Sequence, residues 1–388
     1  MRLGRRAFIG LAGTTAAGAA AAVAFGRERF LGDNLPAATG PRIVSTPFSG
    51  NAAARQDWDA LVREAKREGT LFVLVSGQRA YRRVVNEFQT AFPGIDVQLY
   101  TENTADGWLE RVRADRRASR YTFDLAFVQP EPAITQGQKD GFWTPVRPLL
   151  IRPDVTDDAA WRGGFASRFL DTRGQFCFAW EYQVQHAYAV DSRVVKDGAI
   201  TSVRDLLDPK WRGKVITSDP RTGLGLFAAS NVAKQHGNDV VKGLFVEQQP
   251  KVAATGAELT EGIVSGAYPI AQGVRVRTLQ AARGRGEAGH VKFLDLPDAD
   301  STSGTGLLAF NNTPHPAATR LFLNWVLTRE GQTLMAQNLL TNSARTDVEP
   351  YEKDGTGQPG KPYYEPDRES NYAHTAATQG YVRGLLGT

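Results

Sequence analysis

The sequence predicts an α/β protein of two lobes, each containing a mostly parallel sheet flanked by helices. Short apolar runs alternate along the chain with segments whose apolar residues recur at helical spacing, and this alternation is typical of α/β sheets with right-handed crossovers. The length of 388 residues exceeds what one hydrophobic core usually organises. The hydrophobic content of 41% and the charged content of 22% are those of an ordinary globular protein.

The first lobe is expected over residues 55–180. Trp58, Leu61 and Ala65 share one helical face, which predicts an amphipathic helix that ends near Gly69. Helical patterns then alternate with apolar runs of the kind found in covered parallel sheets. The strands of this lobe are expected at residues 71–75, 95–100 and 124–128.

The run 175–190 alternates and is long, which suits one strand passing between the lobes. Beyond it we expect the second lobe over 181–295, a return to the first lobe with late helices over 296–348, and a C-terminal tail over 349–388 that wraps the surface. The remaining strands are expected at residues 214–218, 268–271, 291–296 and 307–310.

One segment of the second lobe has the pattern of a binding loop. Ser202 and Asp205 form a capping pair for a short helix. After the strand 214–218, Asp219 suits the N-cap of another helix, with Pro220 at its first position. The amides of the next three residues would then lack intrahelical partners, and an arginine beside a helix N-terminus suits an anion. These residues are Arg221, Thr222 and Gly223.

Ligands of open α/β sheets bind outside the carboxyl ends of the strands, where successive connections diverge. Two facing sheets of this kind would form a cleft that closes about the connecting strands. The rule therefore selects the polar residues at four strand ends as the candidate ligand site. They are Ser76, Gly77, Gln78, Gln129, Glu131, Arg221, Thr222, Gly223, Tyr268, Gln272 and Arg275. Trp180 and Tyr182, on the connecting strand, are weaker candidates because aromatic residues there usually pack in a core.

Residues 1–25 have the pattern of an export signal. Arg5-Arg6 precedes a mildly apolar run rich in alanine and glycine, and this resembles a twin-arginine signal with cleavage near Ala24. We therefore expect the twin-arginine export machinery as a partner and a periplasmic product, with an uncleaved membrane anchor as the alternative. Residues 26–54 are expected to be a flexible lead-in.

Composition argues against several other functions. The net charge is +5, but three of the 46 basic residues lie in the leader, and the rest nearly balance the 41 acidic residues, so nucleic acid is not expected. Cys177 is the only cysteine, which excludes an internal disulfide and favours a small buried residue over a nucleophile. The five histidines lack metal-ligand spacing, and no phosphate-binding loop is present. We therefore expect no catalytic residue, metal or cofactor.

Several segments, in order, resemble a known family. DLLDPKWRGKV (205–215), FQTAFPGIDV (88–97) and TPHPAATRLFLNWVLTREGQ (313–332) are similar to segments of the substrate-binding proteins of ABC importers, in the branch of iron(III), polyamine and phosphonate binders. The resemblance runs from about residue 55 to 350. It implies the type II periplasmic-binding-protein fold, an inner-membrane permease as partner, a monomer, and ligand contacts from the four strand ends.

The ligand is the least determined feature. Iron(III) binders of this family use adjacent tyrosines beyond the strand that here ends at Ala271, but VRVR (274–277) stands there, and Tyr363-Tyr364 is interpreted as a surface pair. The arginines favour a small anion such as a phosphonate, sugar phosphate or carboxylate, although the spacing of Arg275 and Arg277 predicts that only one points inward. Ferric iron is the alternative, and an exported enzyme or a sensory binding protein on the same scaffold are the other classes.

Overall fold

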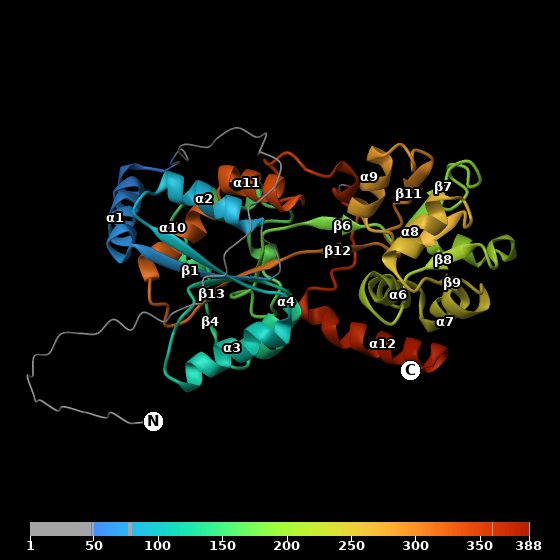
Figure 1. Cartoon of the computed structure of the whole chain (residues 1–388), viewed down its shortest axis with the longest axis horizontal. Helices are drawn as coiled ribbons and strands as arrows, with labels where there is room; N and C mark the ends of the chain where they lie inside the picture. Colours follow the sequence, from blue (N-terminus) through green and yellow to red (C-terminus); the bar gives the residue numbers. More distant parts are fainter. Residues whose placement is uncertain (1–47, 49, 77–79, 359, 388) are drawn as a thin grey trace, which may run out of the picture. The chain divides into compact units, whose positions relative to one another are not determined.

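The computed structural model describes residues 48, 50–76, 80–358 and 360–387. They form an α/β structure with one sheet in each of two lobes, and the two lobes are joined by a small two-stranded sheet (Figure 1). The predicted fold class is thus confirmed. The calls on the export signal, on most of the lead-in and on Gly77 and Gln78 lie outside the described residues.

The sheet of lobe 1 has the order β2-β1-β3-β13-β4, with β5 also paired to β13. β1 pairs in parallel with β2 and β3, whereas β13 is antiparallel to β3, so the sheet is mixed. Leu71 and the run Val73–Val75 of β1 are buried, as expected of a strand covered on both faces. The bounds are β1 Thr70–Ser76, β2 Asp96–Glu102, β3 Leu125–Val128, β4 Trp143–Thr144, β5 Phe178–Ala179 and β13 Gly306–Phe310.

Helices cover both faces of this sheet. Leu71 and Val73 of β1 join one core with residues of α1, α2, α10 and α11, while Leu74 joins a second core with residues of α3. Side chains of a strand alternate between faces, so the two cores lie on opposite sides of the sheet. The bounds are α1 Ala52–Glu68, α2 Tyr81–Ala91, α3 Ala105–Arg117, α4 Pro130–Pro132, α5 Pro153–Thr156, α10 Pro316–Val326 and α11 Arg329–Leu339.

The segment 175–190 is not the single strand that its pattern predicts. It divides into β5, β6 (Gln183–Gln185) and β7 (Tyr188–Asp191), because these pieces pair with three different sheets. β5 pairs in lobe 1 and β7 in lobe 2, whereas β6 pairs antiparallel with β12 (Ser301–Ser303). The two connections between the lobes therefore run side by side as a two-stranded hinge.

The sheet of lobe 2 has the order β11-β7-β10-β8-β9. β8, β9 and β10 are parallel, β7 is antiparallel to β10, and β11 is antiparallel to β7, so β7 alone runs against the other four strands. Its strands are shorter than those of lobe 1, and Ile216 and Ala271 are buried against α8 and α9. The bounds are β8 Val215–Thr217, β9 Lys251–Val252, β10 Ile270–Gln272, β11 Val291–Phe293, α6 Gly223–His236, α7 Asn238–Lys242, α8 Gly256–Val264 and α9 Val276–Gly284.

The C-terminal segment is more structured than the tail we expected. It ends in α12 (Tyr372–Leu386), which packs on α6 and α7 and buries Val382 in the core of lobe 2. The surface interpretation of Tyr363-Tyr364 is wrong for Tyr364, which is buried because its backbone pairs with Ser301 and its hydroxyl bonds Thr375. In the described part of the chain, no helix is both long and apolar enough to cross a membrane.

Candidate solute-binding site

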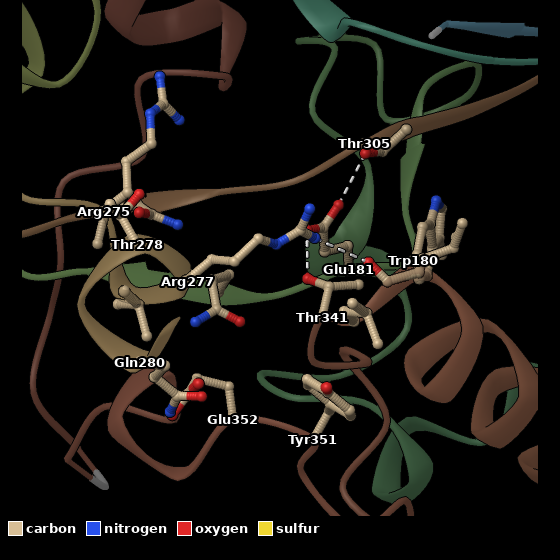
Figure 2. A pocket seen from close by; sticks show the side chains of 15 residues that line it. Trp180, Glu181, Arg275, Arg277, Thr278, Gln280, Thr305, Thr341, Tyr351 and Glu352 are labelled. Atoms are coloured by element: carbon tan, nitrogen blue, oxygen red, sulfur yellow. Dashed lines mark hydrogen bonds between the residues drawn. The ribbon is translucent and has the colours of Figure 1, made fainter. Parts of the chain in front are cut away.

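A cavity of about 360 Å³ lies between the hinge and the start of α9 (Figure 2). Its size falls in the range of small-molecule pockets, and most of its lining side chains are polar or charged. They come from the hinge, from α9, from the end of α11 and from the C-terminal segment. The lining residues are Trp180, Glu181, Gln183, Gln185, Arg275, Val276, Arg277, Thr278, Gln280, Thr305, Leu339, Leu340, Thr341, Tyr351 and Glu352.

Two arginines stand on the α9 side of this cavity. Arg275 is the N-cap residue of α9, with extended backbone and no side-chain cap bond, and Arg277 lies in the first helical turn. Both residues line the cavity, but their side chains point in different directions. Figure 2 shows the side chain of Arg277 extending toward the hinge and that of Arg275 pointing away from it.

The two guanidinium groups differ in their partners. Arg277 donates a hydrogen bond of 3.2 Å to the carbonyl of Leu339, which links α9 of lobe 2 to the end of α11 in lobe 1. Arg275 is exposed, and its guanidinium makes no hydrogen bond or ion pair with any residue that the structure describes. Its charge is therefore available to a ligand.

Glu181 is the acidic group on the hinge side. Its carboxylate accepts hydrogen bonds from the hydroxyls of Thr305 (2.7 Å) and Thr341 (2.5 Å). Burial raises the pKa of this carboxyl, while the two hydroxyl donors and the charge of Arg277 act against that shift. The cavity thus places a carboxyl group within the electrostatic reach of a cation from the opposite lobe.

Two buried polar atoms of the lining residues lack a partner among the described residues. They are the indole nitrogen of Trp180 and the side-chain oxygen of Gln183, both in residues that are more than nine-tenths buried. Buried polar groups are nearly always hydrogen-bonded, and each unsatisfied one costs about 1–3 kcal/mol. Both atoms have almost no exposed area, so neither is presented to the cavity in this conformation.

The sequence-predicted residues of lobe 1 lie elsewhere. Ser76 donates a 2.8 Å hydrogen bond to the side-chain oxygen of Gln129, which joins the ends of β1 and β3 as the strand-end rule anticipates. Glu131 lies in α4, where its carboxylate accepts from the hydroxyl of Thr135. None of these three residues lines the cavity.

The predicted helix start in lobe 2 is displaced. α6 begins at Gly223 with Thr222 as its N-cap residue, so the expectation that Asp219 caps this helix is wrong. The carboxylate of Asp219 instead accepts from the backbone nitrogen and the guanidinium of Arg221. The helix start lies close to this turn, because a Cβ at Gly225 would overlap the carbonyl of Asp219. The charge of Arg221 is thus already paired within the protein.

Gln272 and Tyr268 have structural partners as well. Gln272 is fully buried, and its side-chain oxygen accepts from the hydroxyls of Thr217 (2.6 Å) and Ser218 (3.0 Å). Tyr268 is half-buried beside Gly262, at the edge of the lobe 2 core. Of the nine predicted ligand residues that the structure describes, Arg275 alone lines the cavity, and the roles of all eleven stay predictions.

Sequence reasoning did not select most of the cavity lining. Glu181 could have been found, because it is the charged residue within the apolar run 175–190 and follows Trp180, a candidate already considered. Thr305 and Thr341 carry no such signal, since a single threonine near the end of a strand or helix is unremarkable in sequence. Only the fold brings these hydroxyls to the carboxylate of Glu181.

Within the described residues, one histidine–carboxylate group has the spacing of a metal site: His186, Asp295 and Asp300. Both ring nitrogens of His186 are already used, by the carboxylate of Asp300 (2.8 Å) and the carbonyl of Asp354 (2.6 Å). Asp300 also accepts from two backbone nitrogens, those of Ala187 and Leu296. This arrangement stabilises the hinge and leaves His186 no nitrogen for a metal.

The fold and the interlobe cavity define a binding protein of the bilobal type. The model of the bacterial extracellular solute-binding protein family matches residues 71–338. The chain belongs to this family, whose members bind solutes and are not enzymes. A search of characterised protein sequences gave no match.

Solved structures share the fold at low identity. The ferric binding protein of Bordetella is 16% identical, with a TM-score of 0.64 over 81% of this chain and 98% of that one. The Trichodesmium IdiA (FutA) protein in complex with iron and citrate ligands is 13% identical, with a TM-score of 0.65 over 82% and 100%. An ABC transporter protein from Clostridium perfringens is 16% identical, with a TM-score of 0.65 over 82% and 100%. These similarities concern the fold alone.

Proposed function

We propose that the protein is an exported, periplasmic and monomeric solute receptor that captures a small anionic solute between α9 and the hinge and delivers it to an inner-membrane permease. The observation that carries this proposal is Arg275. It stands at the first turn of a helix, in a cavity of about 360 Å³, with no partner for its charge among the described residues. A phosphonate, a sugar phosphate or a carboxylate would each fit its fork of donors.

The start of α9 adds to this attraction. The backbone amides of Val276, Arg277 and Thr278 precede the first intrahelical donor, since the nitrogen of Leu279 is the one that bonds the carbonyl of Arg275. The helix dipole also places about half a positive charge at this end. An anionic group beside Arg275 would therefore meet a side-chain cation and backbone donors together.

Capture would proceed by closure of the two lobes about the hinge of β6 and β12. The hydrogen bond from Arg277 to the carbonyl of Leu339 supports this, because it already spans the cavity from lobe 2 to lobe 1. A solute that contacts both walls would favour the closed form, and the permease would distinguish that form from the open one.

Ferric iron is the second candidate, and the fold likeness to ferric-binding proteins favours it. Direct coordination by adjacent tyrosines has little support here. Val274 and Arg275 follow β10, and the hydroxyl of Tyr363 is bonded to Asp295 on another surface. A ferric ion enclosed by an anionic chelator such as citrate would instead present carboxylates to Arg275, and this form suits the cavity better.

A thermal-shift screen of the mature protein tests these alternatives. The compounds are inorganic phosphate, alkyl phosphonates, sugar phosphates, citrate, ferric citrate and ferric iron alone. A ligand present at 100 times its Kd stabilises the folded state by about 2.7 kcal/mol, which raises Tm measurably. We expect an anion or ferric citrate to raise Tm. Stabilisation by ferric iron alone, together with a visible tyrosinate colour, would contradict the anion proposal.

Export is tested separately. Replacement of Arg5 and Arg6 by lysine should abolish transport if the leader is a twin-arginine signal, and the protein should then stay in the cytoplasmic fraction. Replacement of Arg2, the other arginine of the leader, is the matched control. Periplasmic protein in both variants would argue for a different export route.

A further inference from the structure

The segment after α11 lies beyond the part of the chain that matches the family model, which ends at residue 338. We call residues 349–387 the strap. In Figure 1 the strap passes from the region of α11 along the hinge and ends in α12 beside α6 and α7. Its contacts involve the hinge and both lobes.

The strap first attaches to the hinge. The backbone of Glu352 exchanges two 2.8 Å hydrogen bonds with the side chain of Asn342, and the carbonyl of Asp354 accepts from His186, between β6 and β7. Further on, Tyr364 pairs in parallel with Ser301 of β12, and its carbonyl accepts from the nitrogen of Thr302. The strap thereby adds a third element to the two-stranded hinge.

It next attaches to lobe 1. The guanidinium of Arg368 donates to the carbonyls of Ser167 (2.8 Å) and Phe169 (3.0 Å). The carboxylate of Glu369 accepts from both the backbone nitrogen and the hydroxyl of Thr172. Charge-assisted bonds of this kind are among the stronger hydrogen bonds of proteins.

Its last part attaches to lobe 2. Lys234 of α6 donates to the side chain of Asn371 at 2.8 Å, and a ring nitrogen of His374 bonds the carbonyl of Ser230 at 2.8 Å. Val382 of α12 is fully buried in the lobe 2 core. The strap is therefore fastened to lobe 1 and lobe 2 within a few residues of its own sequence.

The strap also reaches the cavity. Tyr351 and Glu352 are among the lining residues, on the side opposite Thr305 (Figure 2). Glu352 is buried, and burial raises the pKa of its carboxyl. A rotation of the lobes that moved the strap would therefore also move one wall of the cavity.

We propose that the strap is a third connection between the lobes, which restricts their rotation about the hinge and holds Tyr351 and Glu352 in the wall of the solute site. Two strands alone permit bending and twisting about the hinge. A third segment fixed to both lobes removes part of that freedom. That the cavity binds a solute rests on the proposed function. The restriction of lobe rotation does not depend on what the cavity binds.

The test measures interlobe distance in the protein without any added compound. Spin labels are attached at Arg63→Cys in α1 and Glu261→Cys in α8, two exposed positions, while the buried Cys177 stays unlabelled. Double electron–electron resonance then gives the distance distribution. The lobe 1 attachment is released by Arg368→Ala/Glu369→Ala, and the lobe 2 attachment by Lys234→Ala/His374→Ala/Val382→Asp, since the buried Val382 also anchors α12 in lobe 2. Lys361→Ala, at an exposed strap residue, is the control.

We expect a narrow distribution in the labelled parent protein and in the control, and a distribution at least twice as wide in each release variant. A variant that combines both sets of substitutions should give a distribution no wider than either set alone. Detachment of the strap from one lobe already removes its restriction on lobe rotation. The proposal would be overturned if the distance distribution widened in only one of the two release variants, or in neither. A broad distribution in the parent protein would overturn it too, and this measurement does not require any release variant to fold. Because the distance measurement uses no added compound, a failure of the thermal-shift screen would not affect its result.

Discussion

Two polar regions of lobe 2 differ in how their charges are paired. After β8, Arg221 is bound by Asp219, and Gln272 at the end of β10 is enclosed by two hydroxyls. At the start of α9, only three residues further along the chain, the guanidinium of Arg275 has no partner among the described residues, and Arg275 lines the cavity. Both regions lie at strand ends, so the position of a polar residue in the topology does not decide its availability.

A candidate binding residue is therefore judged by whether its charge and hydrogen-bonding groups already have partners within the protein. An arginine with a bidentate carboxylate partner has little left to offer an anion, because a ligand would have to displace that partner. An unpaired arginine at a helix start needs no such exchange. This criterion separates Arg221 from Arg275, although both looked equally suitable in the sequence.

The largest expected effect is on ligand binding, and it tests whether Arg275 rather than Arg221 contacts the anion. Arg275→Ala should weaken binding of the compound that gives the largest thermal shift by about 10- to 100-fold, since a hydrogen bond to a charged group contributes about 1.5–3 kcal/mol. Titration calorimetry measures the loss. Tm without ligand should stay unchanged because the side chain is exposed. An unchanged Kd would mean that Arg275 is not the anion contact.

The second prediction concerns His186, whose two ring nitrogens are both hydrogen-bonded. His186→Ala should destabilise the protein by about 1–3 kcal/mol, because it removes two buried hydrogen bonds. Burial disfavours the charged ring, yet the hydrogen bond and charge of Asp300 prevail and raise the pKa of His186. Burial raises the pKa of Asp300 as well, but its three hydrogen-bond donors favour the carboxylate.

The sign of the pH dependence follows from the raised pKa. The folded state holds the proton more tightly than the unfolded state, so this stabilisation is complete below about pH 6.5 and disappears as the pH rises through the folded-state pKa. Urea unfolding at pH 5.5 and at pH 9 measures the difference between wild type and His186→Ala. An equal difference at both pH values would show that the ring is not charged in the folded protein.

A third change addresses the buried amide. Gln272→Leu should lower the free energy of unfolding by about 1–3 kcal/mol, because it removes the acceptor of the Ser218 hydroxyl and leaves the Thr217 hydroxyl only the carbonyl of Ser218. Solute affinity should change less than threefold, since Gln272 does not line the cavity. Loss of binding with normal stability would restore Gln272 as a ligand residue, as the strand-end rule predicts.

The smallest effect is expected for Arg221→Ala. Its ion pair with Asp219 is partly exposed, and such pairs contribute little to stability. We expect a small drop in Tm and an unchanged Kd. A tenfold loss of affinity would show that the solute displaces Asp219, and the comparison between the two regions would then fail.

Local patterns predicted much of the fold. Leu71 and Val73 belong to a continuous apolar run, and a strand buried on both faces requires such a run. The capping pair Ser202 and Asp205 is also confirmed, because both partners are local. Not every local pair could be predicted: the sequence suggests a helix cap at Asp219, whereas its carboxylate binds Arg221, two residues further on.

The hinge and the candidate site depended on distant partners throughout. The run 175–190 is regular in sequence, and only its pairing with three sheets breaks it. Tyr364 is buried by Ser301, more than sixty residues away along the chain. Thr305 and Thr341 likewise become part of the cavity through Glu181. The sequence could indicate which lobe a segment enters, but not which polar groups would meet there.

The lone thiol has a practical consequence. Cys177 is fully buried against Gly306 of β13, and burial raises the pKa of its thiol well above the ordinary value. It can therefore neither form a mixed disulfide nor react with an alkylating reagent while lobe 1 is folded. The rate at which a chromogenic disulfide reagent modifies the protein should thus report how often that lobe opens, with no engineered probe.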